Sequence, residues 1–243
     1  MKRPSVAINQ TTKRKFQRRL LKWYEKYQRN LPWRKTSDPY RILVSEIMLQ
    51  QTQVDRVIPK YEEFLDKYPT LEALAEAPLE EVKGTWFPLG YNVRPVRLHS
   101  IAREAMAKYG GSLPRTKEEL VALKGIGDYT AGAILSFAFG QDAPILDTNV
   151  ARVLYRVFIG NRRLRRHPGM VESPPGRQGG GDLKSQGVRK KLWALSEALI
   201  PRGKAYDFNQ ALMDFGAQVC TARKPLCLLC PMHDFCKSYP ITK

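Results

Sequence analysis

The chain has 243 residues, of which 43% are hydrophobic, and it carries a formal net charge of +18 at neutral pH with a pI near 9.9. This length is enough to bury a core in one large domain or in two lobes. No apolar run approaches the roughly 20 residues that a membrane helix needs, so we expect no membrane partner. A positive charge of this size is unusual for an enzyme of small-molecule metabolism and favours a polyanionic partner.

The positive charge is concentrated in two segments. Residues 1–24 hold eight Lys or Arg and no acidic residue, and residues 161–191 hold nine Lys or Arg against two acidic residues. Taken singly, each segment could be a solvated basic tail. Taken together with the motifs described below, the two segments are interpreted as contacts to nucleic-acid phosphates, which predicts binding that weakens steeply with salt.

Helical periodicity with capping residues recurs along the chain, and strand signals are almost absent. The first predicted helix ends at Asn30–Pro32, and its apolar face consists of Phe16, Leu20, Trp23, Tyr24 and Tyr27. Further helices are predicted over residues 40–52, 55–67, 71–76, 94–109, 117–122, 129–139, 148–158, 187–200 and 207–219. The sequence therefore predicts an all-α protein.

The segment Met170–Gly187 interrupts this pattern, because its paired prolines and triple glycine cannot hold a helix, and we interpret it as a mobile surface loop. We expect the chain to form two lobes, and we expect the functional site to lie in a cleft between them. The expected divisions are 1–29 (basic segment and first helix of one lobe), 30–140 (second lobe), 141–219 (return to the first lobe, with a basic Pro/Gly-rich loop at about 161–187) and 220–236 (cysteine loop).

Four cysteines lie close together at Cys220, Cys227, Cys230 and Cys236, in the spacing C-x6-C-x2-C-x5-C. A disulfide framework is typical of small secreted domains, whereas this chain begins with a charged Met1–Arg3 and lacks an apolar leader. Structural zinc usually uses two C-x2-C pairs, and only one is present. The uneven run from one winding loop favours a 4Fe-4S cluster, and hence a reducing, cytoplasmic (in a prokaryote, nucleoid-associated) setting.

A second motif lies in the middle of the chain. Thr116–Glu119 has the pattern of a capping box, and a short helix then leads into the hairpin Leu123–Gly127 before Tyr129 opens another helix. Gly125 and Gly127 allow a tight turn whose amides, with the next helix N-terminus, can face a phosphate. An ordinary turn between two helices would have a similar sequence.

About twenty residues beyond the hairpin, Asp147 lies where the N-cap of a helix is predicted. Its carboxyl can cap the helix, take part in chemistry, or do both.

Together these motifs resemble the helix-hairpin-helix (HhH-GPD) DNA glycosylase superfamily over roughly residues 30–240. Within it, Ser45–Val54 is similar to the MutY-like branch of adenine glycosylases, as are Leu31–Arg34, Leu89–Tyr91 and Phe208–Asp214. The resemblance implies a two-lobed helix-hairpin-helix glycosylase fold with an iron-sulfur cluster loop. It also implies a monomer that acts on double-stranded DNA containing a mismatched or damaged base.

The resemblance assigns catalytic roles to two acids. Adenine is a poor leaving group as an anion, so Glu46 would protonate it, and the apolar neighbours of Glu46 would raise the carboxyl pKa enough to keep a proton near neutral pH. Asp147, with Asn149 beside it, would stabilise the oxocarbenium-like sugar. Tyr129 occupies the position of the lysine that forms a Schiff base in strand-cutting relatives, which implies a monofunctional glycosylase.

The remaining site residues are also implied by the resemblance. Gln51 and Tyr91 would enter the base stack, since the target base must leave the duplex, and Gly125 and Gly127 would bind the backbone. The base pocket would consist of Arg34, Trp33, Leu49 and Gln210. The cluster would shape its loop so that Arg223 and Lys224 approach phosphates.

The identity of the excised base stays open at this point. Relatives of the adenine branch usually carry a further C-terminal domain that recognises 8-oxoguanine, whereas this chain extends seven residues beyond Cys236. A thymine or uracil mismatch glycosylase acting opposite guanine is therefore the alternative, while the Gln50–Gln53 run favours adenine opposite guanine or 8-oxoguanine. A non-catalytic, lesion-binding iron-sulfur protein is a more remote alternative.

Overall fold

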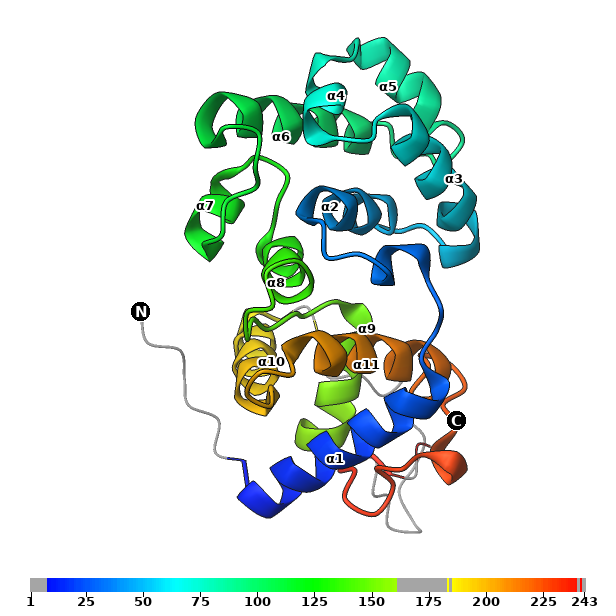
Figure 1. Ribbon diagram of the computed structural model, residues 1–243. Coiled ribbons are helices and arrows are strands. Elements are labelled where there is room, and N and C mark those ends of the chain that lie inside the picture. Colours follow the sequence, from blue (N-terminus) through cyan, green and yellow to red (C-terminus); the bar gives the residue numbers. More distant parts are fainter. Residues whose placement is uncertain (1–7, 161–182, 184, 240, 242–243) are drawn as a thin grey trace. The chain divides into compact units, whose positions relative to one another are not determined.

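The computed structural model describes residues 8–160, 183, 185–239 and 241 (Figure 1). The regular structure of these residues is helical and includes no strand, so the predicted all-α class is confirmed. The first seven residues of the basic N-terminal segment, and most of the predicted loop at 161–187, lie outside the described residues. None of the described helices combines the length and the hydrophobicity needed to cross a bilayer.

Backbone contacts divide the chain into two compact units. Unit 1 combines Met1–Arg29 with Pro144–Lys243, and unit 2 is the continuous segment Asn30–Ala143. Unit 1 is thus assembled from the two ends of the sequence. Its two parts are tied together at Asp214, whose fully buried carboxylate accepts hydrogen bonds from the Arg29 amide at 3.1 Å and from Arg29 Nε at 2.7 Å.

Unit 2 consists of short and medium helices around a buried central helix, α2. Its elements are η1 Pro32–Arg34, α2 Pro39–Met48, α3 Val54–Lys67, α4 Leu71–Glu76, α5 Leu79–Trp86, α6 Val93–Tyr109, α7 Lys117–Ala122 and α8 Asp128–Phe137. Helix α2 packs against α8, α3 and α6, and every residue from Ile42 to Met48 is buried. Residues at all angles around its axis are therefore part of the core.

Two features of unit 2 differ from the sequence-based expectation. Helix α2 ends at Met48 rather than continuing to residue 52, because the backbone turns through a left-handed conformation at Gln51 (φ 56°). Helix α5 was not predicted from the sequence, since Gly84 and the preceding Pro78 obscured it. Its signals are two acidic residues in the first turn and the buried pair Val82 and Trp86, four residues apart.

Unit 1 is organised around α11. Its elements are α1 Gln10–Tyr27, α9 Thr148–Leu154 continued by the π-helical turn η2 Tyr155–Ile159, α10 Gln186–Leu199, α11 Ala205–Gln218 and the 3-10 turn η4 Cys227–Leu229. Helix α11 packs against α1 and α9, and α10 also packs against α9. The approach of α9 to α11 is close enough that a Cβ on Gly216 would lie 2.7 Å from the Asn149 Cβ, so this position requires glycine.

Helix α1 begins at Asn9, whose side chain accepts the amide hydrogens of Thr11 and Thr12. Phe16, Leu20 and Tyr24 are buried as the periodicity predicts. The prediction was wrong for Tyr27, which is 47% exposed and stacks on Trp23 instead of entering the core.

Candidate functional site

Glu46 lies in the third turn of α2 and is 5% exposed. The helix that carries it is fixed at its start by Asp38, whose carboxylate accepts hydrogen bonds from the amides of Tyr40 (2.8 Å) and Arg41 (3.3 Å), and by Pro39 at the first helical position. The side chain of Glu46 is thus largely withdrawn from water.

The four residues predicted for a base pocket come from both units. Trp33 and Arg34 belong to η1, and Leu49 caps the C-terminus of α2, so these three lie in unit 2. Trp33 is buried edge-on against Tyr61, with ring centroids 5.5 Å apart, and therefore also serves the core. Gln210 is buried in α11 of unit 1.

Two exposed turns of unit 2 carry the residues predicted to enter the base stack. Among described residues other than glycine, only Gln51 (φ 56°) and Tyr91 (φ 50°) have a left-handed backbone. This conformation costs of the order of 1–3 kcal/mol for a residue with a Cβ and persists only where neighbouring structure enforces it. The two side chains are exposed, Tyr91 by 57%.

The predicted hairpin is formed by Leu123–Gly127 between α7 and α8. Gly125 adopts φ 119°, and a Cβ there would lie 3.3 Å from the Arg97 Cβ, so a glycine is required. Gly127 is the N-cap of α8 with an ordinary φ of −96°, and a Cβ on it would meet open space. The helix N-terminus thus carries no capping side chain and is open to an anion.

The helix before the hairpin, α7, is capped at its N-terminus by a side chain. Thr116 accepts the Glu119 amide hydrogen at 3.3 Å, as the capping-box pattern predicts, and its hydroxyl donates to the Glu119 carboxylate. Tyr129 is part-buried in the first turn of α8, whereas Lys124 is exposed on the turn itself.

Asp147 is the N-cap of α9 in unit 1. Its Oδ1 accepts the Val150 amide hydrogen at 2.7 Å, and its Oδ2 accepts from Asn149 Nδ2 at 3.2 Å. Arg152 Nη2 donates in turn to Asn149 Oδ1 at 2.7 Å. Burial raises the pKa of the Asp147 carboxyl, and the hydrogen bonds from Val150 and Asn149 and the charge of Arg152 oppose that rise. The Asp147 carboxyl therefore caps α9 and is also oriented by a hydrogen-bond network.

Arg152 connects this network to the cysteine loop. Its Nε donates to the Cys220 carbonyl at 2.8 Å, and its Nη2 donates to the Gly216 carbonyl at 2.7 Å. Arg156, one turn later, donates to the carbonyls of Thr221 (2.7 Å) and Ala222 (3.0 Å). Sequence reasoning missed both arginines, although the spacing of three residues from Asn149 to Arg152 on a helix was a usable signal.

The four cysteines are free, and their thiols interact with one another. Burial, and to a lesser degree the charges of the other three sulfurs, raise the pKa of the Cys230 thiol to about 12. Burial and the charges of Cys220 and Cys227 raise the pKa of Cys236. Thiolates crowded in this way are stabilised by the positive charge of bound iron. Among the described residues no group of three or more His, Cys, Asp or Glu is arranged for a single metal ion, whereas a 4Fe-4S cube is wide enough to separate its four ligands.

Arg223 and Lys224 are exposed on the segment between the first two cysteines. The other end of the loop is held by α1, because Arg19 donates to the Pro231 carbonyl and Lys15 and Arg19 both pair with Asp234. These two pairs hold the pKa of Asp234 down at about 2. Two of the basic residues that the sequence assigned to phosphate contact are thus engaged within the protein.

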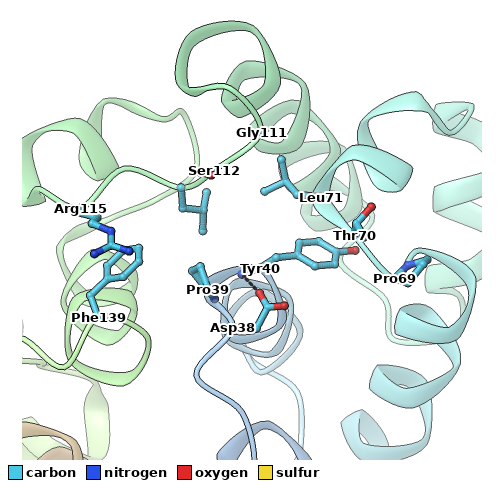
Figure 2. A pocket seen from close by; sticks show the side chains of 11 residues that line it. Asp38, Pro39, Tyr40, Pro69, Thr70, Leu71, Gly111, Ser112, Arg115 and Phe139 are labelled. Atoms are coloured by element: carbon cyan, nitrogen blue, oxygen red, sulfur yellow. Dashed lines mark hydrogen bonds between the residues drawn. The ribbon is translucent and has the colours of Figure 1, made fainter.

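A cavity of about 420 Å³ in unit 2 lies apart from the predicted site residues (Figure 2). It is enclosed by the start of α2, the start of α4, the segment after α6 and the end of α8, and Figure 2 shows the Arg115 side chain beside the Phe139 ring on its wall. Neither Glu46 nor any other residue of the predicted pocket lines it.

Residues 44–172 match the family described as HhH-GPD superfamily base excision DNA repair protein, and residues 220–236 match the iron-sulfur binding domain of endonuclease III. The second match confirms the 4Fe-4S cluster that the cysteine spacing predicts.

Curated relatives of two kinds are similar to the chain. The adenine DNA glycosylase of Homo sapiens is 43% identical over 232 residues, which are 92% of this chain and 39% of that protein. The thymine-DNA glycosylase of Aeropyrum pernix is 38% identical over 226 residues, which are 91% of this chain and 93% of that protein. The chain thus spans less than half the length of the human relative.

Among solved structures, a thermostable thymine-DNA glycosylase superposes with a TM-score of 0.81 at 34% identity, covering 96% of this chain and 98% of that one. Endonuclease III trapped on DNA in an estranged-adenine complex superposes with a TM-score of 0.75 at 22% identity, covering 95% of this chain and 97% of that one. The second likeness concerns the fold alone.

Proposed function

This chain belongs to the HhH-GPD superfamily of base excision DNA repair proteins, and we propose that it is a monofunctional DNA N-glycosylase that acts as a single chain on mismatched double-stranded DNA. The observation that carries the proposal is a pair of carboxyls in contrasting environments. Glu46 is buried within the core helix α2, whereas Asp147 caps α9 and accepts hydrogen bonds from the Val150 amide and the Asn149 carboxamide, to which Arg152 donates in turn. Contrasting environments divide acid and base roles between two carboxyls.

Glu46 acts as the general acid. A carboxyl withdrawn from water keeps its proton more readily, and a positioned acid contributes roughly a hundredfold to ten-thousandfold to a rate. The proton is delivered to a ring nitrogen of the departing base, so that the base leaves neutral rather than as an anion.

Asp147 acts in its ionised form. Cleavage of the N-glycosidic bond develops positive charge on the sugar, and a carboxylate beneath the sugar lowers that barrier. Because burial opposes ionisation, the hydrogen bonds from Val150 and Asn149 and the nearby Arg152 are needed to keep the charge. Water then adds to the sugar and yields an abasic site.

Tyr129 excludes the lyase chemistry of a lysine at this position, because a phenol forms no Schiff base with the sugar. The strand therefore stays intact until alkali is added. Lys124, exposed on the hairpin, is assigned to the backbone-binding face rather than to covalent chemistry.

The DNA is bound by the hairpin and the cluster loop. The backbone amides of Gly125 and Gly127 bind one phosphate, and exposed Arg223 and Lys224 bind others. Gln51 and Tyr91, both exposed on strained turns, occupy the stack that the extruded base leaves. Arg34, Trp33 and Leu49 of unit 2 are assigned to contacts with the extruded base, and the family resemblance assigns Gln210 of unit 1 to the same role.

We propose adenine opposite guanine or 8-oxoguanine as the first substrate. The run Gln50–Gln53 and the 43% identity to the human adenine enzyme support it. Thymine or uracil opposite guanine is the second candidate, because the thymine-DNA glycosylase of Aeropyrum pernix matches over 93% of its own length. Since these relatives are all named as glycosylases, a non-catalytic lesion-binding role is not proposed.

Single-turnover assays on four duplexes test the proposal: A opposite 8-oxoguanine, A opposite G, T opposite G and U opposite G. We expect base loss from the adenine duplexes, with strand breaks only after alkali. Base loss confined to the T and U duplexes would select the second candidate. Strand cleavage before alkali would contradict the assignment of Tyr129, and no base loss from any duplex would contradict glycosylase activity. Glu46→Gln serves as the inactive control.

A further inference from the structure

Arg94 lies in the first turn of α6, and its charged side chain is buried, with an exposed fraction of 3%. None of the ion pairs among the described residues joins it to a carboxylate. Its guanidinium instead donates to backbone carbonyls in two separate segments: the end of α2 with the turn that follows it, and the turn that precedes α6. Nη1 donates to Ile47 (3.3 Å), Met48 (2.7 Å) and Gln50 (2.6 Å), and Nη2 donates to Leu89 (3.1 Å) and Gly90 (3.1 Å).

Two of these carbonyls have a special place in the chain. The Gln50 carbonyl belongs to the peptide group that precedes Gln51, and the Gly90 carbonyl belongs to the peptide group that precedes Tyr91. Gln51 and Tyr91 are the non-glycine residues with left-handed backbones among those described. One planar cation therefore fixes the orientation of both peptide groups that set these unusual φ angles.

We call this set of hydrogen bonds the Arg94 clamp. Ring contacts reinforce it at the turn that carries Tyr91. The Arg94 guanidinium lies 5.4 Å from the Trp86 ring centroid and 5.3 Å from that of Tyr91. The Arg94 amide donates to the Tyr91 carbonyl at 2.9 Å, and Trp86 Nε1 donates to the Gly90 carbonyl at 3.3 Å. The exposed Tyr91 ring thus rests on the buried cation.

The arrangement is a poor device for stability alone. Burying a guanidinium is costly, and burial accordingly lowers the pKa of Arg94. Its buried Nε makes no hydrogen bond, so all of its bonds are directed at the two turns. An apolar side chain would fill this part of the core but would not connect the turns.

We propose that Arg94 is a positioning residue that locks the Gln51 turn to the Tyr91 turn, so that both side chains enter the base stack together when the target base is extruded. This inference rests on the proposed function, because it assigns Gln51 and Tyr91 to that step. Arg94 touches neither the base nor the sugar, and acts through the two turns.

Arg94→Lys tests the clamp with its charge retained. Lysine has three donors on one nitrogen and cannot span two turns with two separate nitrogens. We expect the fluorescence rise of 2-aminopurine at the mismatched position to be largely lost, and the single-turnover rate to fall between roughly tenfold and a hundredfold. Hydrogen exchange is expected to rise in both turns. Arg103→Lys, an exposed arginine of the same helix, is the matched control and is expected to match the wild type.

A double-mutant cycle separates positioning from general destabilisation. In a Gln51→Ala, Tyr91→Ala background the clamp has no side chains to present, so Arg94→Lys is expected to change the rate by less than about twofold. An equal loss in both backgrounds would overturn the proposal, as would wild-type base opening by Arg94→Lys. Melting temperature and iron content, measured on each variant, reveal any variant that fails to fold.

The base-opening signal does not require excision, and this keeps the two proposals apart. A wild-type protein that opens the duplex and removes no base would contradict the proposed function, while the ratio of signals between Arg94→Lys and wild type would still judge the clamp. A wild-type protein that does not open the duplex at all would overturn both.

Discussion

Units 1 and 2 both use arginines to gather backbone carbonyls, but they differ in what else holds the gathered segments. In unit 2 the buried Arg94 donates hydrogen bonds to carbonyls of two turns, and both turns are far in sequence from the four cysteines. In unit 1 the part-exposed Arg152 and Arg156 bind the segment that starts at Cys220, which then continues into the cluster loop. The unit 2 turns are thus held by contacts within the chain, whereas the unit 1 loop has such contacts and also carries the four cysteines that would hold the iron-sulfur cluster.

The largest expected effect is loss of either proposed catalytic carboxyl, one from each unit. Glu46→Gln and Asp147→Asn should each lower the single-turnover rate by roughly a hundredfold to ten-thousandfold while DNA binding is retained. Asparagine caps a helix as well as aspartate does, so Asp147→Asn should not lower the melting temperature, whereas Asp147→Ala should cost about 1 kcal/mol. Wild-type excision by Asp147→Asn would instead support a role in capping alone.

The next effect concerns the cluster. Cys230→Ser should release iron and raise hydrogen exchange between residues 216 and 236, because the loop loses the group that orders it. Exchange at the hairpin Leu123–Gly127 in unit 2 should not change. Leu228→Ser, which lies between Cys227 and Cys230 and is 88% exposed in the wild type, should retain iron. Equal loss of protection in both units would contradict the contrast drawn between them.

A smaller effect is expected from pH. Burial raises the folded-state pKa of Asp147 above its ordinary 3.8, so the active carboxylate should be lost as pH falls through that raised value. A raised pKa also means that the protonated form stabilises the fold at low pH, and this contribution is lost as pH rises. The difference in melting temperature between Asp147→Asn and the wild type, measured at the same pH, should therefore shift in favour of Asp147→Asn as the pH rises from low to neutral.

Arg152 provides the control for this dependence. Its charge lowers the pKa of Asp147, so Arg152→Gln should move the acidic limb of the rate profile to higher pH. Arg156→Gln, whose hydrogen bonds go to the cysteine segment, should leave that limb in place. A profile unchanged by Arg152→Gln would mean that another group sets the limb.

The smallest effect separates the two hairpin glycines. Gly125→Ala should cost about 1–3 kcal/mol in stability, since φ is 119° and the new Cβ would press on Arg97. Gly127→Ala should leave stability nearly unchanged, because its Cβ meets open space, and should weaken DNA binding by blocking the approach of a phosphate. Thermal melts and titrations with an uncleavable duplex distinguish the two; the opposite pattern would show that Gly127 has a structural role.

Local sequence patterns predicted most of the helices. Capping residues and apolar periodicity located α1, α3, α4 and α7 well, because these signals act within one or two turns. They failed at Gln50–Thr52, over which the predicted helix continued but the chain turns away from α2, since the Gln50 carbonyl is bound by a residue more than forty positions later. They also failed at α5, whose helix depends on packing against α6 and α3.

The sequence alone determined the class of fold, the family resemblance, the cluster from the spacing of its cysteines, and the candidate acids. These features depend on residue types at short spacings along the chain, so they can be recognised from the sequence. Only the tertiary structure decided that Arg94 joins two turns, that Arg152 connects Asp147 with the cysteine segment, and that Lys15 and Arg19 hold the cluster loop. Each of these contacts joins elements distant in sequence, and what selects them is the burial of polar groups that must find hydrogen-bond partners, which no local period encodes.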